Sequence, residues 1–114
     1  MPDKSRVEQR RKAVRSLCEE DPDLELEIDS FVIRLAEQVD HLQDAEQAGA
    51  LDALSERAAS IGDQADRLGY PDFARIVQKI CVACGEDEAL FVREALGQLT
   101  ELTRCIRMGH RGAA

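Results

Sequence analysis

The chain has 114 residues, of which 44% are hydrophobic and 33% charged, and its formal net charge at pH 7 is −8. This length suits one domain that buries about two-thirds of its unfolded surface, so residues 1–114 are predicted to form a single domain. Glycine, proline and aromatic residues are sparse, which favours an ordered helical chain. No apolar run approaches the roughly 20 residues that span a bilayer, and the charged opening lacks a signal peptide's apolar stretch. A cytoplasmic protein without a membrane span is expected.

The charge is divided unevenly along the chain. Residues 1–18 carry six Lys or Arg and two acidic residues, a net +4, so the rest of the chain carries about −12. An acidic protein of this kind disfavours nucleic-acid binding. The basic residues of the opening could contact an acidic partner or a membrane surface, but a solvated helix face is the simpler interpretation; they are Lys4, Arg6, Arg10, Arg11, Lys12 and Arg15.

Helical periodicity predicts five segments, of which the first two surround a turn. The first covers about residues 4–20 and ends before Asp21 and Pro22, because proline disfavours helix in the residue before it. The second covers about residues 24–48, and Gly49 closes it. Its inward stripe is Leu24, Ile28, Phe31, Leu35, Leu42 and Ala45.

The third segment covers about residues 51–68, with Gly69 as its C-terminal stop. Its apolar residues recur at spacings of three and four, which is the pattern of one helix face packed in a bundle. These residues are Leu51, Leu54, Ala58, Ile61, Ala65 and Leu68.

The last two segments follow a proline. The fourth opens with Pro71, a residue suited to a first helical turn, and runs toward Gly85. The fifth starts near Glu86, where acidic residues suit the positive end of a helix dipole. Gly109 is expected to end it and to leave a loose tail over residues 109–114.

These segments predict an all-α fold. Each long segment has one apolar stripe and short connections, so neighbouring helices should run antiparallel. The expected architecture is an antiparallel up-and-down four-helix bundle over about residues 24–108, with residues 4–20 as a short N-terminal capping helix. No useful stretch alternates apolar and polar residues, so no strand is predicted.

Three local features of the chain resemble those of a known family. They are the Asp21 and Pro22 turn before an apolar helix with Phe31, the joint over residues 48–54, and the pair Leu68 and Gly69 that ends a helix. Together they make the chain resemble the histidine phosphotransfer (HPt) domain of bacterial two-component phosphorelays. The resemblance covers nearly the whole chain and implies a four-helix bundle with a short leading helix.

The resemblance also shows what is missing. In that family the phosphoacceptor His lies about ten residues before the terminal Gly, with Lys three positions later and Gly at the fourth. This chain has Ala59, Gly62 and Asp63 at those positions. An Ala methyl has no lone pair to attack a phosphoryl group. His41, in the second segment, and His110, in the tail, lack the family's surroundings, so neither restores the site.

By the same resemblance, the third segment should carry the partner-binding surface. The face is acidic, which indicates either an ordinary solvated surface or one adapted to a basic partner or a decoy complex. Within it, Gly62 either weakens the helix, permits close approach of another backbone, or remains from the family's small residue. The expected binding residues are Asp52, Ser55, Glu56, Ala59, Gly62, Asp63, Asp66 and Arg67.

The four cysteines are interpreted as reduced core thiols. Cys81 and Cys84 form a CxxC, but no second CxxC or His pair completes a zinc set, and no strand precedes them as in a thioredoxin-like motif. They continue the apolar face of the fourth segment, and Cys18 and Cys105 are read in the same way. No metal or cofactor is expected.

The sequence therefore favours a protein that is not an enzyme. The leading hypothesis is a degenerate HPt protein that binds a response-regulator receiver or a histidine kinase without accepting phosphate. The alternative is a helical interaction or oligomerisation module unrelated to phosphorelay, including a homodimer. The same bundle can carry unrelated roles, so the fold alone does not choose between them.

Overall fold

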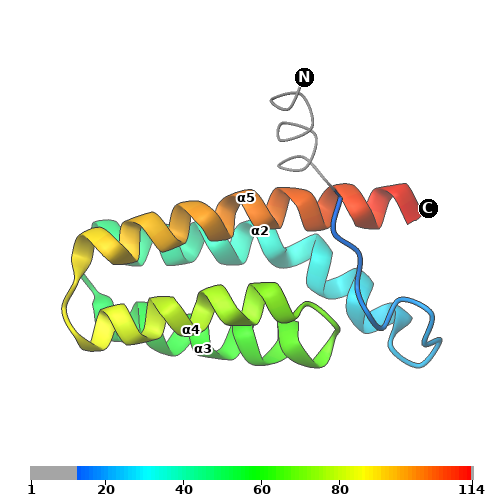
Figure 1. Ribbon diagram of the computed structural model, residues 1–114, viewed down its shortest axis with the longest axis horizontal. Coiled ribbons are helices and arrows are strands. Elements are labelled where there is room, and N and C mark those ends of the chain that lie inside the picture. Colours follow the sequence, from blue (N-terminus) through cyan, green and yellow to red (C-terminus); the bar gives the residue numbers. More distant parts are fainter. Residues whose placement is uncertain (1–12, 114) are drawn as a thin grey trace, which may run out of the picture.

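The computed structural model describes residues 13–113 and has four helices. They are α2 (Glu25–Gln47), α3 (Leu51–Arg67), α4 (Pro71–Gly85) and α5 (Ala89–Ala113) (Figure 1). No strand occurs within residues 13–113, which confirms the all-α, four-helix prediction at this level. None of the helices there is long and apolar enough to cross a bilayer.

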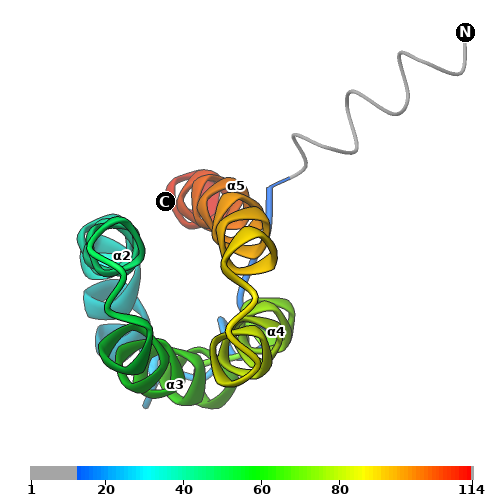
Figure 2. The ribbon, with the colours of Figure 1, turned by 90° about the vertical axis from the view of Figure 1, so that its left-hand side faces the viewer.

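The four helices surround one core. Each helix contacts two neighbours, most extensively α3 with α4, and α2 closes the ring against α5 (Figure 2). Figure 1 shows the chain doubling back at each connection, so that the α2–α3 and α4–α5 connections share one end and the α3–α4 turn lies at the other. The largest fully buried side chains are Phe73, Leu35, Leu42, Leu54, Ile80, Leu99, Ile106 and Val92.

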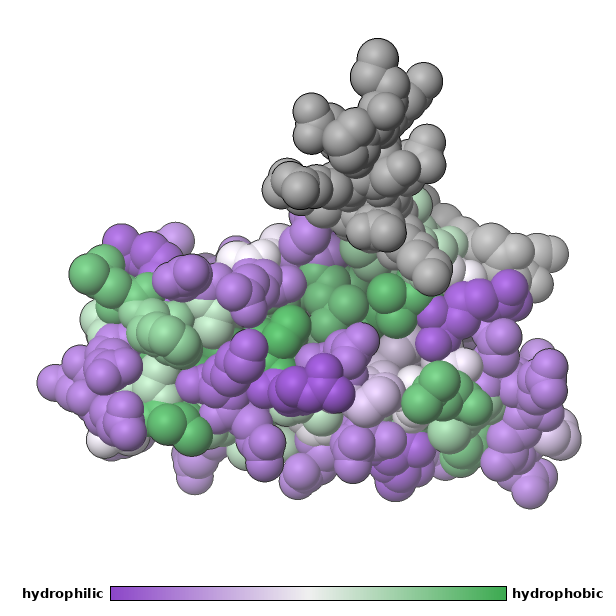
Figure 3. Space-filling model, in the orientation of Figure 1, coloured by the Kyte–Doolittle hydropathy of each residue, from purple (hydrophilic) through white to green (hydrophobic). Residues whose placement is uncertain are grey.

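The apolar stripes predicted from the sequence point into this core. Ile28, Phe31, Leu35 and Leu42 of α2 are buried, while Leu24 is half-buried. Two more buried residues of α2, Val32 and Val39, belong to the same stripe. Hydrophilic side chains dominate the visible surface, and hydrophobic ones gather along the line between α4 and α5 (Figure 3).

Helices α2 and α3 each end in a hydrogen-bonded turn of the same type. After α3, Tyr70 N donates to the Ala65 carbonyl at 2.8 Å and Gly69 N to that of Asp66 at 3.2 Å. Gly69 has φ +91° and Gly49, after α2, has φ +72°, the left-handed conformation that glycine adopts without steric penalty. Both glycines were predicted as stops, and both are.

Helix α4 ends in a turn of the same type, in which a residue other than glycine takes the left-handed position. Glu88 N donates to the Ala83 carbonyl at 2.9 Å, and Asp87 takes the left-handed position with φ 57°. Aspartate tolerates this conformation better than most residues. Because these residues close α4, α5 begins at Ala89 and not near Glu86 as the acidic cluster suggested.

The predicted N-terminal helix is wrong over the described residues. Residues 13–20 form an irregular segment with turns, here called the strap, and residues 4–12 lie outside the part that the structure describes. Its backbone bonds reach distant helices: Val14 N donates to the Cys105 carbonyl at 3.0 Å and Leu17 N to the Gly69 carbonyl at 2.9 Å. Helical bonding within the strap would remove these donors.

The loose tail predicted over residues 109–114 is also wrong, because α5 continues to Ala113. Gly109 is buried, and a Cβ there would overlap the carbonyl of Val14 in the strap. A glycine inside a helix costs about 1 kcal/mol relative to alanine, too little to end a well-packed helix. The glycine permits close approach of the strap, and it does not mark the helix end.

Candidate docking site on helix α3

Helix α3 divides cleanly into a buried and an exposed side. Leu54, Ala58, Ile61 and Ala65 are buried in the core at spacings of three and four. The opposite residues therefore face solvent, as expected for an amphipathic helix at the edge of a bundle. Among the predicted binding residues, the exposed ones are Asp52, Glu56, Ala59, Asp63, Asp66 and Arg67. These six define the outer face of α3.

Two predicted binding residues lie where α3 packs against α4. Gly62 is buried, and a Cβ there would lie 2.8 Å from Val77 Cγ1 and 3.1 Å from Val77 Cβ. Ser55 is half-buried, and its carbonyl oxygen accepts a bond from Cys81 Sγ at 3.6 Å. The geometry at Gly62 shows close packing of α3 against Val77 of α4, in agreement with the interpretation that the glycine permits close approach. Neither residue belongs to the outer face.

The outer face is strongly acidic. It carries four carboxylates, and its one cation, Arg67, pairs through Nη1 with Glu27 Oε2 of α2 at 2.6 Å. Both partners are more than half exposed, so this pair contributes little to stability. The pair with Glu27 nevertheless engages the guanidinium of Arg67. The outer face therefore has no other positive charge to compensate its four carboxylates, which belong to Asp52, Glu56, Asp63 and Asp66.

The CxxC thiols lie between α3 and α4 and are half-buried. Burial, Cys81 and the carboxylate of Asp52 raise the pKa of the Cys84 thiol, which keeps it protonated and a poor nucleophile. Both thiols are free. Within residues 13–113 no three His, Cys, Asp or Glu side chains are placed to hold a metal ion together.

Neither histidine reaches the outer face of α3. His41 is exposed on α2. His110, expected in a loose tail, lies on α5, where its Nε2 is 2.8 Å from Asp29 Oδ1. Helical periodicity continued past Gly109 could have placed His110 on α5, but nothing local in the sequence indicates its partner on α2.

At the centre of the outer face, Ala59 lies between Glu56 and Asp63 with its methyl group exposed. The methyl group of Ala59 offers no lone pair that could attack a phosphoryl group, and the charged groups around it are carboxylates that can bind cationic side chains. Comparison with protein-family models, with curated proteins and with solved structures finds no match for the chain.

Proposed function

We propose that the protein is a non-catalytic HPt-like member of a two-component phosphorelay, with the antiparallel up-and-down bundle of that family. It binds a response-regulator receiver or a histidine kinase through the outer face of α3 and acts as a decoy, inhibitor or scaffold. One observation supports this above the others: Ala59 is exposed on a long helix, at the position where the resemblance places the phosphoacceptor. In this proposal the surface still contacts the partner protein, but the imidazole nitrogen that would attack the phosphoryl group is absent.

The charge of the outer face restricts its partners. Its four carboxylates would repel the acidic pocket of a receiver at close range. A partner must therefore bring basic side chains or a bound Mg²⁺ to the contact. The predicted complex should weaken as ionic strength rises, because exposed charge pairs are screened over about 10 Å at 0.1 M salt.

The first experiment is an NMR titration of the labelled protein with receiver domains from its own organism. Amide shifts centred on residues 52–67 are expected. The variant Glu56→Lys/Asp63→Lys should weaken binding about tenfold. The matched control Glu37→Lys/Glu94→Lys makes the same charge change at exposed sites on α2 and α5 and should change affinity less than about twofold. Equal losses in both variants would contradict docking on α3.

A second experiment restores the chemistry. The variant Ala59→His/Asp63→Lys places an imidazole at the exposed position and an ammonium one turn later, while Gly62 stays unchanged because a side chain there meets Val77. The imidazole nitrogen would attack phosphorus in the receiver's aspartyl phosphate, forming a P–N bond while the carboxylate leaves. Acid-labile label on this variant, and none on Ala59→Gln/Asp63→Lys, is expected. Binding on α3 without label would remove the phosphorelay assignment.

A second candidate function rests on exposed apolar side chains. Val82 near the end of α4 and Leu90 and Phe91 at the start of α5 are 59%, 80% and 49% exposed. Such a group suits self-association of a helical module. Sedimentation of the wild type and of Leu90→Gln/Phe91→Gln distinguishes this reading: a dimer that the variant abolishes supports it. An obligate dimer that buries α3 would contradict receiver docking.

A further inference from the structure

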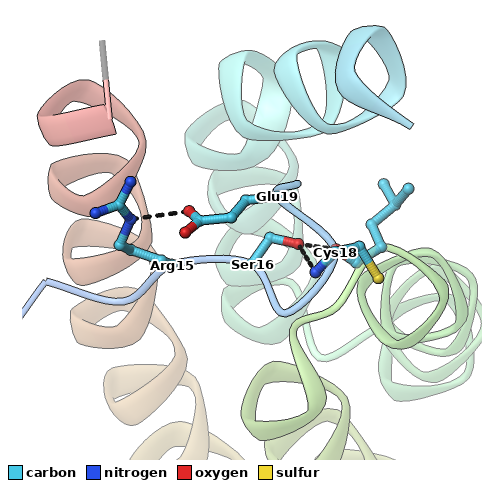
Figure 4. A network of polar contacts seen from close by, with 5 residues as sticks. Arg15, Ser16, Cys18 and Glu19 are labelled. Carbon is cyan, nitrogen blue, oxygen red and sulfur yellow. Dashed lines mark hydrogen bonds and ion pairs between the residues drawn. The ribbon is translucent and has the colours of Figure 1, made fainter. Parts of the chain in front are cut away.

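A groove of about 610 Å³ opens at the end of the bundle that carries the strap. The strap, the first turns of α2 and the last turns of α5 form its walls, and Tyr70 lies in it behind them. Figure 4 shows Arg15 and Glu19 of the strap between α5 and α2. The volume lies within the range of about 300–1,000 Å³ that is typical of ligand sites.

The walls of the groove carry an excess of negative charge. Four carboxylates line it, from Glu19 and Glu20 of the strap and from Glu25 and Asp29 of α2. Arg15 Nε pairs with Glu19 Oε2 at 2.8 Å, and Asp29 holds His110. Within residues 13–113, Glu20 and Glu25 have no ion-pair partner. Glu25 suits the first turn of α2 in any case, so the carboxylates alone do not establish a site.

The deciding observation is the hydroxyl of Tyr70. The residue is 97% buried, at 3% exposure, with its ring stacked on Phe31 at 5.8 Å between centroids. Buried tyrosine hydroxyls normally find a hydrogen-bond partner, yet within residues 13–113 this one has none. No enclosed side-chain oxygen there lacks a partner, so the hydroxyl must reach solvent.

Tyr70 lines this groove together with Glu19 and Glu20 of the strap. Burial and the carboxylate of Glu19, a groove residue, raise the pKa of Tyr70 to about 12. The phenol therefore stays neutral at physiological pH and offers an oxygen that can accept a bond from a cationic donor. The hydroxyl, which reaches solvent, and the unpaired carboxylates of Glu20 and Glu25 are acceptors that one cationic donor group could bond.

We propose that this groove binds an arginine-rich peptide segment of a partner protein. A guanidinium carries five N–H donors in a plane, which allows it to bond carboxylates of the strap and α2 and the hydroxyl oxygen of Tyr70 together. A divalent ion fits less well, because within the described residues no three acidic or other ligating groups converge. The groove shares no residue with the outer face of α3, so this proposal stands apart from receiver docking.

Fluorescence anisotropy with a labelled hexa-arginine peptide and the full chain tests the proposal at about 0.1 M salt. The variant Glu20→Gln/Glu25→Gln should weaken binding at least tenfold. The control Glu56→Gln/Asp63→Asn removes the same two charges from the outer face of α3 and should weaken it less than about threefold. Tyr70→Phe removes one oxygen and no charge, and a loss of about threefold is expected; a melting curve verifies that it is folded.

Two outcomes overturn the proposal. Equal losses of peptide affinity in the groove variant and its control would show that the peptide binds only through the net charge of −8. The second concerns the chain's own basic residues: if Arg10→Gln/Arg11→Gln/Lys12→Gln in the full chain shifts the amides of residues 19–29 and raises peptide affinity, the groove belongs to that segment and not to a partner.

Discussion

The two ends of the bundle use glycine for different reasons. At the far end, where α2 joins α3, Gly49 has a left-handed φ of +72°, and a Cβ there would meet nothing within 4 Å. At the strap end, Gly69 has φ +91°, and its Cβ would lie 2.6 Å from Ser16 Oγ and 2.8 Å from Leu17 N. The same turn is therefore held by backbone conformation alone at one end, and by conformation and packing at the other.

The largest expected effect comes from Gly69→Ala. The substitution imposes left-handed strain and pushes the strap off the α3–α4 turn, so we expect a loss of about 3 kcal/mol in the free energy of unfolding. Gly49→Ala imposes strain without a clash and should lose about 1 kcal/mol. Urea denaturation measures both. Similar losses would show that contact with the strap adds nothing to the cost of a side chain at position 69.

The next effect compares two glycines of α5. Gly109→Ala places a Cβ against the Val14 carbonyl and should lose about 2 kcal/mol, with faster hydrogen exchange at the Val14 amide. Gly97 is exposed with nothing within 4 Å of a Cβ, so Gly97→Ala should gain about 0.5–1 kcal/mol through helix propensity. A gain at both positions would contradict close packing of the strap on α5.

The strap end should also make the fold sensitive to alkali. Tyr70, the one tyrosine in the chain, has a pKa of about 12 in the folded protein and about 10 when unfolded. The contribution of the raised Tyr70 pKa to folding stability is complete below pH 10 and is lost as pH rises through 12. The reason is that the tyrosine releases its proton at lower pH in the unfolded chain than in the folded protein. Between these values the wild type should lose roughly 1–2 kcal/mol more than Tyr70→Phe. Parallel stability curves for the two proteins would rule this out.

The smallest effect concerns one hydroxyl of the strap. Ser16 is buried; its Oγ donates to the Leu68 carbonyl and accepts from Cys18 N at 2.9 Å (Figure 4). Ser16→Ala leaves the Leu68 carbonyl without this donor and should cost about 1 kcal/mol. Ser60→Ala, at an exposed position of α3, serves as control and should change stability by less than about 0.5 kcal/mol. Equal values would show that the strap holds without this bond.

The outer face of α3, which we propose as the docking surface, could largely be placed from the sequence. Once Ala58 and Ile61 are assigned to the core, a helix of fixed pitch puts Ala59 and Asp63 on the other side, and both are exposed. Ser55 and Gly62 could not be placed in this way, because they lie on the border between core and solvent. Their surroundings depend on how closely α4 approaches, and the contact of Gly62 with Val77 is a property of two helices together.

The sequence by itself determined α2, α3 and α4, together with the glycines that end α2 and α3. Bounds of 24–48 and 51–68 were predicted, and the helices cover Glu25–Gln47 and Leu51–Arg67. Periodicity and C-terminal glycines act within a few residues of the chain, so a local pattern carries this information.

Tertiary structure alone decided the strap, the continuation of α5 through Gly109 and the groove around Tyr70. Residues 13–20 contain apolar residues that looked helical, yet Val14 and Leu17 donate their amide hydrogens to carbonyls more than 50 residues away in the sequence. Each backbone donor bonds once, and partners so distant in the chain leave no local signal. The strap amides could bond within a local helix or to carbonyls of distant residues, and the arrangement that packs against α3 and α5 is the one that forms.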